Sequence, residues 1–279
     1  MDKTKKAILA VSYGSSLAAA REKTIDIIEK ELADAFPDRK LYRAWTSEFM
    51  RKRAKEQDGL SVPNLAEVID QMRKDGIEDV VVEPVFVACA SEYQKVIDAF
   101  KQSADAFSQV CIGMPLLGSD EDLKTVAALL PNLEGNPEMV PDSERMQGTD
   151  PEGTPLSKDA IVFMAHGSSS MPESNQIFME LADELKRQKL ENVLIGTIDG
   201  APGFDFIPET LREKEPGKVI LMPFLLAAGS HVIRDMSSDR EGSWKNRLEA
   251  EGFQVEAIPK GLAEYEEIRQ IFVKHALDV

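Results

Sequence analysis

Short apolar runs alternate with amphipathic segments along almost the whole chain. The apolar runs predict buried β-strands over 6–11, 41–45, 79–87 and 110–114 in the first half, and over 160–165, 193–198, 219–226 and 254–258 in the second. Between them, helical spacing of apolar side chains predicts helices over 15–35, 63–75, 119–130, 172–189, 205–214 and 265–277, with others opening at Glu92 and around Trp244 and Leu248. This alternation predicts an α/β protein built on parallel sheets.

One long stretch, residues 131–158, breaks the alternation. It is rich in proline, glycine and acidic residues and has no sustained hydrophobic period, which is typical of a linker. The sequence therefore predicts an N-terminal α/β lobe over 1–130 and a C-terminal α/β lobe over 159–279.

The two halves follow the same plan. The stretch KAILAVSYGSS in the first half corresponds to DAIVFMAHGSS in the second. VEPVFVACASEY aligns with LMPFLLAAGSHV without a gap, so that Pro84 meets Pro223 and Glu92 meets His231, each pair 139 positions apart. We predict two similar lobes, each with a four-stranded parallel sheet flanked by helices, and a cleft between them.

Groups that can carry chemistry follow the predicted strands of the second half. His166 comes after the first strand, Asp199 after the second and His231 after the third, while Tyr13 and Glu92 take the corresponding places in the first half. Two imidazoles and a carboxylate can bind a divalent transition metal and leave coordination positions open. The sequence thus predicts a metal site with most ligands in the C-terminal lobe.

Each of these residues also has a structural interpretation. His166 and His231 can be hydrogen-bonded residues at strand ends, and Glu92 can be an acid favoured by the positive end of a helix. Asp199 lies in DGAPG, a string typical of turns. His275, in the last predicted helix, is interpreted as a surface residue.

Charge narrows the range of partners. The net charge of −16 argues against nucleic acid or an anionic membrane as a partner. The Gly-Ser-Ser turns after Tyr13 and His166 lack a P-loop lysine and the GxGxxG spacing, so nucleotide binding is weakly supported. The densest cationic cluster is Arg51, Lys52, Arg53 and Lys55, which is either a solvated face or a local site for an anionic ligand.

Other features bear on location. No apolar run approaches the length of a membrane span, and the apolar run near the N-terminus is shorter than that of a signal peptide. Cys89 and Cys111 lie in or beside apolar runs, which predicts buried free thiols in a reducing compartment. We therefore expect a cytoplasmic protein, and the sequence leaves open whether it forms a homo-oligomer.

Several motifs together resemble a known family. They are VSYGSS at the N-terminus, VFVACASEY around Glu92, AHGSSS around His166 and PFLLAAGSHVIRDMSSD around His231. The set is similar to the class II chelatases and, more narrowly, to the anaerobic sirohydrochlorin cobaltochelatases, over nearly the whole chain. The resemblance implies two α/β lobes with a tetrapyrrole cleft, and insertion of a divalent metal without a nucleotide.

The resemblance also implies roles for residues. The metal ligands fall on His166, His231 and Asp199, where the family usually has glutamate, so that Asp199 ligates directly, or through water, or shifts the metal preference. His166 is then both ligand and acceptor of a pyrrole proton, because an imidazole accepts protons near neutral pH. Glu92 is expected to take the second proton or guide the cation.

The expected substrates are Co²⁺ and sirohydrochlorin, within cobalamin synthesis. We expect Tyr13, Ser15, Arg51 and Arg53 to bind this polycarboxylate. Fe²⁺ insertion towards sirohaem or haem is an alternative, since the same ligands suit both ions, and Fe²⁺ or Ni²⁺ can replace Co²⁺ in vitro. From another class, a non-catalytic protein whose two α/β lobes close on a metal or tetrapyrrole is a further alternative, which the lack of a signal-peptide pattern disfavours.

Overall fold

The computed structural model describes residues 5–133, 159–229 and 232–279. The chain divides into two compact units: unit 1 comprises Met1–Ser119 and Ala263–Val279, and unit 2 comprises Asp120–Leu262. The predicted linker lies largely outside the described residues.

Unit 1 is built on a parallel sheet with strand order β2-β1-β3-β4. Its strands are β1 (Lys6–Ser12), β2 (Lys40–Trp45), β3 (Asp79–Val85) and β4 (Gln109–Ile112). Its helices are α1 (Ala18–Glu22), α2 (Ile25–Ala35), α3 (Glu48–Asp58), α4 (Leu65–Lys74), α5 (Ser91–Gln102) and α11 (Glu266–Leu277).

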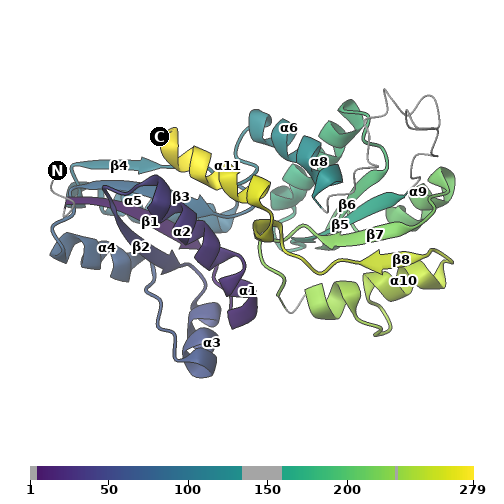
Figure 1. Cartoon of the computed structure of the whole chain (residues 1–279), viewed down its shortest axis with the longest axis horizontal. Helices are drawn as coiled ribbons and strands as arrows, with labels where there is room; N and C mark the ends of the chain where they lie inside the picture. The colour runs from purple at the N-terminus through teal and green to yellow at the C-terminus, as the bar shows by residue number, and fades with distance from the viewer. Residues whose placement is uncertain (1–4, 134–158, 230–231) are drawn as a thin grey trace. The chain divides into compact units, whose positions relative to one another are not determined.

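The two faces of this sheet are covered by different helices. Alternate residues of β1, including Leu9 and Val11, pack with α4 and α5 in one core cluster. The C-terminal helix α11, yellow in Figure 1, packs against α2 and β3 on the other face. Burial along β1 is continuous from Ala7 to Ser12, because successive side chains point to opposite faces of the sheet and helices cover both faces.

Unit 2 repeats the plan, with strand order β6-β5-β7-β8 and all pairs parallel. Its strands are β5 (Ala160–Gly167), β6 (Val193–Asp199), β7 (Val219–Pro223) and β8 (Val255–Ala257). Its helices are α6 (Asp120–Leu129), α8 (Gln176–Arg187), α9 (Phe206–Lys214) and α10 (Trp244–Ala250). The predicted fold class of two four-stranded parallel sheets flanked by helices is confirmed.

The division of the chain differs from the predicted lobes 1–130 and 159–279 in two helices. Helix α6 packs against α8 in unit 2, where the side chain of Gln188 donates to the Lys124 carbonyl oxygen over 2.9 Å. Helix α11 belongs to unit 1, where Arg269 pairs with Glu31 of α2 at 2.7 Å. The amphipathic pattern of a helix indicates that one of its faces covers a sheet, but it does not indicate which of the two sheets.

Local structure departs from two predicted helices and adds a helix that was not predicted. The helix expected over 15–35 breaks into α1 and α2 at Lys23 and Thr24. The charged stretch after β2 forms α3, which begins at the N-cap Ser47 and ends at Gly59 in the left-handed region, with φ of 69°. Helix α4 starts after Asn64, whose side chain forms a capping box with Glu67, and not at Pro63.

The cysteines were predicted wrongly. Neither forms a disulfide bond, as expected, but Cys89 is exposed and Cys111 is only partly buried. Cys89 lies beyond the end of β3, and Cys111 lies on the edge strand β4, where fewer neighbours cover a side chain. In the part of the chain that the structure describes, no helix is long and apolar enough to cross a membrane.

Candidate active site

His166 and Asp199 come together at the ends of neighbouring strands of unit 2. His166 is the penultimate residue of β5, Asp199 is the last of β6, and the register pairs Gly167 with Asp199. Both side chains are exposed to solvent. The strand-end position thus brings a histidine and a carboxylate to one edge of the sheet, as the sequence predicts.

The backbone at Gly167 makes this approach possible. Gly167 has φ of +69°, and a β-carbon there would lie 2.1 Å from the Asp199 carbonyl oxygen. Any side chain would therefore push the two strand ends apart, and left-handed backbone also favours glycine. The glycine after His166 is required by the geometry of the site itself.

A hydrogen bond to the backbone orients the imidazole of His166. Its Nδ1 lies 2.9 Å from the carbonyl oxygen of Gly167. A carbonyl only accepts, so Nδ1 carries the hydrogen in the neutral ring and the lone pair lies on Nε2. Nε2 is the atom that can bind a metal or accept a proton.

Asp199 is held as a carboxylate by the loop that follows His166. Its Oδ2 accepts hydrogen bonds from the backbone N–H and the hydroxyl of Ser169, both over 3.0 Å. These bonds, with a smaller contribution from His166, lower the pKa of Asp199 below its ordinary value. A carboxylate that stays ionised suits a cation, while Oδ2 is already committed to Ser169.

The sequence interpretation missed the residue that fixes this loop. Asn175 is buried, accepts from the Ser168 N–H over 2.8 Å and donates to the Ser168 carbonyl over 3.0 Å. It lies in a 3₁₀ turn, Pro172–Asn175, just before α8. An asparagine near a helix start was a usable signal, because such residues often bond nearby backbone.

His231 lies outside the described residues. Directly after it, Val232–Ser237 forms a short π-helix, a rare form that often occurs at functional sites. Within the described residues, no group of three or more histidine, cysteine, aspartate or glutamate side chains has an arrangement that could hold a metal ion. The three-ligand set that includes His231 stays a prediction.

The remaining candidates lie at the matching edge of unit 1. Tyr13 and Ser15 follow β1, Arg51 and Arg53 lie on α3 after β2, and Glu92 lies in the first turn of α5 after β3. Glu92 Oε1 accepts from Lys95 over 2.6 Å, whereas its buried Oε2 has no hydrogen-bond partner among the described residues. A buried carboxylate oxygen without a partner is unusual and fits an atom that meets a cation or proton.

The two arginines of α3 have different surroundings. Arg51 lines a groove of about 790 Å³ beside α4 and is tied to the Val62 carbonyl oxygen over 2.7 Å and to Glu67. Arg53 lies over the ring of Phe49, with 5.5 Å between guanidinium carbon and ring centroid. Two residues apart on a helix, they cannot face the same point.

His275 was predicted to be a surface residue and is instead partly buried. Its Nδ1 lies 2.8 Å from the Met114 carbonyl oxygen within unit 1. This contact joins α11 to the loop after β4, so His275 has a structural role.

Two parallel βα units with a histidine and a carboxylate at neighbouring strand ends define an α/β protein suited to metal chemistry. A sequence model of the family described as cobalt chelatase (CbiK) matches residues 6–279, and the chain belongs to this family. The resemblance read from the motifs is therefore confirmed.

Individual relatives agree with this assignment. The sirohydrochlorin cobaltochelatase of Salmonella typhimurium is 30% identical over 97% of this chain and 95% of its own length. The sirohydrochlorin cobaltochelatase CbiKC of Nitratidesulfovibrio vulgaris is 29% identical over 98% of this chain and 89% of its own length. SirB from Bacillus subtilis, solved with Fe³⁺, has a similar fold, with a TM-score of 0.59 and 15% identity over 98% of this chain and 95% of its own.

Proposed function

We propose that the protein inserts Co²⁺ into sirohydrochlorin to give cobalt-sirohydrochlorin, in the anaerobic route to cobalamin. The family match across residues 6–279 carries this proposal. The relatives named sirohydrochlorin cobaltochelatase support the choice of both substrates.

In this proposal His166 is the catalytic residue. Insertion requires that two pyrrole N–H protons leave while the ion exchanges water for ring nitrogens. His166 Nε2 first binds the cation or accepts a pyrrole proton, since Nδ1 faces the Gly167 carbonyl. Exposure at the strand end allows a large macrocycle to reach this atom.

Asp199 and His231 complete the proposed donor set. Asp199 presents Oδ1 to the cation, since Oδ2 is held by Ser169. A shorter carboxylate than the family's usual glutamate then reaches the ion directly or through a water molecule. Weak ligation by few protein groups suits a metal that is a substrate and must be released.

The residues of unit 1 are proposed to bind and deprotonate the macrocycle. Glu92 offers its buried Oε2, which has no hydrogen-bond partner in the described parts of the chain, to the second pyrrole proton or to the incoming cation. Tyr13, Ser15 and Arg53 are proposed to contact the tetrapyrrole and its carboxylates. Arg51 acts separately from Arg53, since it is tied to Glu67 in the groove.

The test is absorbance-monitored insertion into sirohydrochlorin with Co²⁺, Fe²⁺ and Ni²⁺ compared side by side. We expect catalytic turnover with the largest kcat/KM for Co²⁺. Preference for Fe²⁺ would assign the protein to sirohaem or haem synthesis instead. Saturation at one equivalent without release of metallated product would identify a binding protein and refute the enzyme.

The charge of Asp199 is expected to matter for the rate. Asp199→Asn keeps the shape of the side chain and its bonds to Ser169 but removes the negative charge. We expect kcat for Co²⁺ insertion to fall about tenfold or more, with little change in the KM for sirohydrochlorin. Asp205→Asn, which alters a highly exposed aspartate paired with Arg247 in the same unit, is the matched control and should insert at the wild-type rate. Equal rates in the two variants would remove Asp199 from the donor set.

The location of the protein is proposed to be the cytoplasm. Neither cysteine forms a disulfide bond although one of them is exposed, which favours a reducing compartment.

A further inference from the structure

Arg21 is not itself a candidate site residue, but it is buried beside the loop that carries Ser15 and beside helix α3, which carries Arg53. Arg21 lies on α1 with only 7% of its surface exposed. A guanidinium is costly to remove from water unless its donors are satisfied, and a buried ion pair adds little net stability compared with apolar packing. Its burial therefore calls for an account other than stability.

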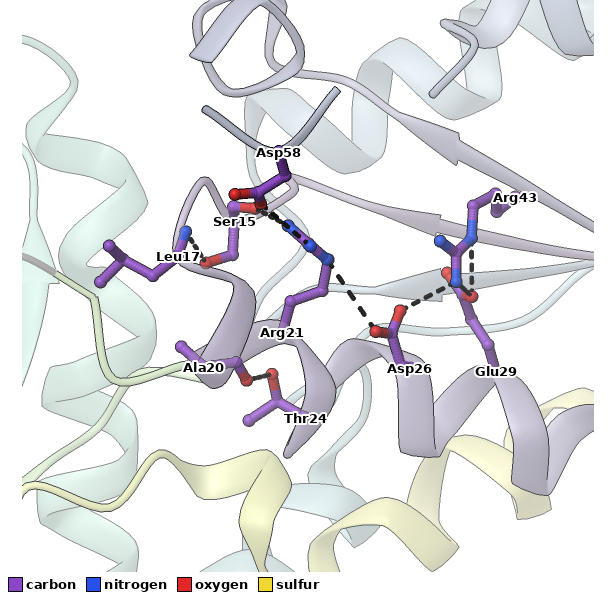
Figure 2. Close-up of polar contacts among 9 residues, drawn as sticks. All are labelled: Ser15, Leu17, Ala20, Arg21, Thr24, Asp26, Glu29, Arg43 and Asp58. Atoms are coloured by element: carbon purple, nitrogen blue, oxygen red, sulfur yellow. Dashed lines mark hydrogen bonds and ion pairs between the residues drawn. The ribbon is translucent and has the colours of Figure 1, made fainter. Parts of the chain in front are cut away.

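The contacts of Arg21 join three segments (Figure 2). Its Nη1 donates to the Ser15 carbonyl oxygen over 3.1 Å, and its Nη2 donates to Asp58 over 3.2 Å. Its Nε lies 3.9 Å from Asp26, which in turn pairs with Arg43. Arg21 thus links the loop after β1 to the last residue of α3 and to the start of α2.

Helix α3 depends on such contacts because it is thinly packed. Of the eleven residues of α3, one, Ala54, is buried, so few side chains attach the helix to the sheet. Gln57, next to Asp58, makes a further link to the same loop. In the amide orientation that satisfies its neighbours, Gln57 donates to the Ser16 carbonyl oxygen over 2.9 Å and accepts from Arg53 over 3.1 Å. The end of α3 is therefore fastened to the Ser15 loop at two points.

The loop itself lies against the aromatic ring next to Arg21. Gly14 has φ of +91°, and a β-carbon there would lie 2.5 Å from the ring of Trp45. The guanidinium of Arg21 lies 5.9 Å from the centroid of the same ring. Backbone, ring and guanidinium leave the loop between Tyr13 and Leu17 little freedom.

We propose that Arg21 is a positioning residue that holds the Ser15 loop and α3 in one arrangement and thereby sets the affinity for the polycarboxylate tetrapyrrole. The inference rests on the proposed function, in which Tyr13, Ser15 and Arg53 contact that substrate. Arg21 itself is buried and acts through these segments.

The chain offers a matched ion pair for comparison. Arg39 donates two bonds to the Asp79 carboxylate, over 2.8 and 3.1 Å, and one to each of the Ala7 and Asp79 carbonyl oxygens over 3.3 Å. Its side chain is also largely buried, at 13% exposed. Ala7 and Asp79 lie at the start of β1 and β3, at the opposite edge of the same sheet from the Ser15 loop.

The experiment compares Arg21→Lys with Arg39→Lys in the full chain. For each variant we would measure thermal unfolding, the Kd for sirohydrochlorin without metal, and KM and kcat for Co²⁺ insertion. Lysine keeps the charge but cannot reach Ser15 and Asp58 at once. We expect both variants to lose stability, but only Arg21→Lys to raise Kd and KM, by about tenfold, with kcat within about twofold of wild type.

Other outcomes separate the inference from the proposed function. Wild-type Kd and KM in Arg21→Lys, or an equal rise in Arg39→Lys, would overturn the positioning role. If Arg21→Lys does not fold, Asp58→Ala removes the acceptor of Arg21 Nη2 at a less buried residue and carries the same expectation. A wild-type protein that binds sirohydrochlorin without inserting metal would refute the proposed function, while the comparison of Kd values would still decide the role of Arg21.

Discussion

His166→Ala is expected to abolish metal insertion, with a loss of about 100-fold or more in kcat. The variant removes the Nε2 lone pair, which is the proposed cation ligand and proton acceptor at the end of β5. Because the side chain is exposed, unfolding temperature and circular dichroism should stay near those of wild type. The measurement is initial rate of absorbance change at saturating Co²⁺ and sirohydrochlorin.

His275→Ala is the matched control for this variant. It removes a partly buried imidazole that contacts Met114 in unit 1, so we expect reduced stability with kcat preserved. Wild-type turnover in His166→Ala would refute the assigned role. A rate lost equally in both variants would show that the assay reports on folding.

Glu83→Met is expected to stabilise the protein by about 1–3 kcal/mol near pH 8, the usual cost of a buried polar group without a partner. Glu83 lies in β3, is completely buried, and neither carboxylate oxygen has a hydrogen-bond partner among the described residues. Burial raises the pKa of Glu83 well above 4.5. The measurement is the free energy of unfolding from urea titrations.

The internal repeat explains why methionine is the chosen replacement. The Gly113 N–H donates to the Val82 carbonyl oxygen, and at the equivalent position of unit 2 the Ile258 N–H donates to the Leu221 carbonyl oxygen. Glu83 beside Gly113 therefore corresponds to Met222 beside Ile258. A β-carbon on Gly113 would lie 2.2 Å from Glu83 Oε2, so the glycine makes room for the carboxyl group. The same fold accepts an apolar pair at this position.

The stability gained by Glu83→Met should increase with pH. The pKa of Glu83 is higher in the folded than in the unfolded protein, so above about pH 4.5 the folded state still holds the proton that the unfolded state has lost. Wild type therefore loses stability as the pH rises above about 4.5. The difference between Glu83→Met and wild type should then be smallest near pH 4 and grow towards pH 8. Glu83→Gln should also lose this dependence while gaining less stability. A difference that stays constant with pH would contradict the prediction.

The sheets and the His166–Asp199 pair could be predicted because each rests on local pattern. Apolar runs mark the strands, and parallel strands deliver the residues that follow them to one edge. The gapless match of Pro84 with Pro223 gave the repeat without any knowledge of the fold. What lies within a few residues of a buried strand end is therefore open to reasoning from sequence.

The features that were missed depend on distant partners. Nothing around Arg21 marks it as buried, because its acceptor Asp58 is 37 residues away and Ser15 contributes only a carbonyl. Arg51 and Arg53 formed one cationic cluster in the sequence, yet Glu67 and Phe49 take them to different surroundings. Cys89 looked buried because apolar residues precede it, although the strand ends at Val85.

The packing of the C-terminal helix α11 in unit 1 has a consequence for biosynthesis. Unit 2 is one continuous segment, whereas unit 1 lacks α11 until residues 266–277 have been synthesised. On a ribosome, unit 2 can therefore complete its core first. The sheet of unit 1 stays hydrated on the face that α11 covers until α11 has been synthesised. Nascent chains stalled before residue 263 should accordingly protect β5 and β7 from proteolysis sooner than β3.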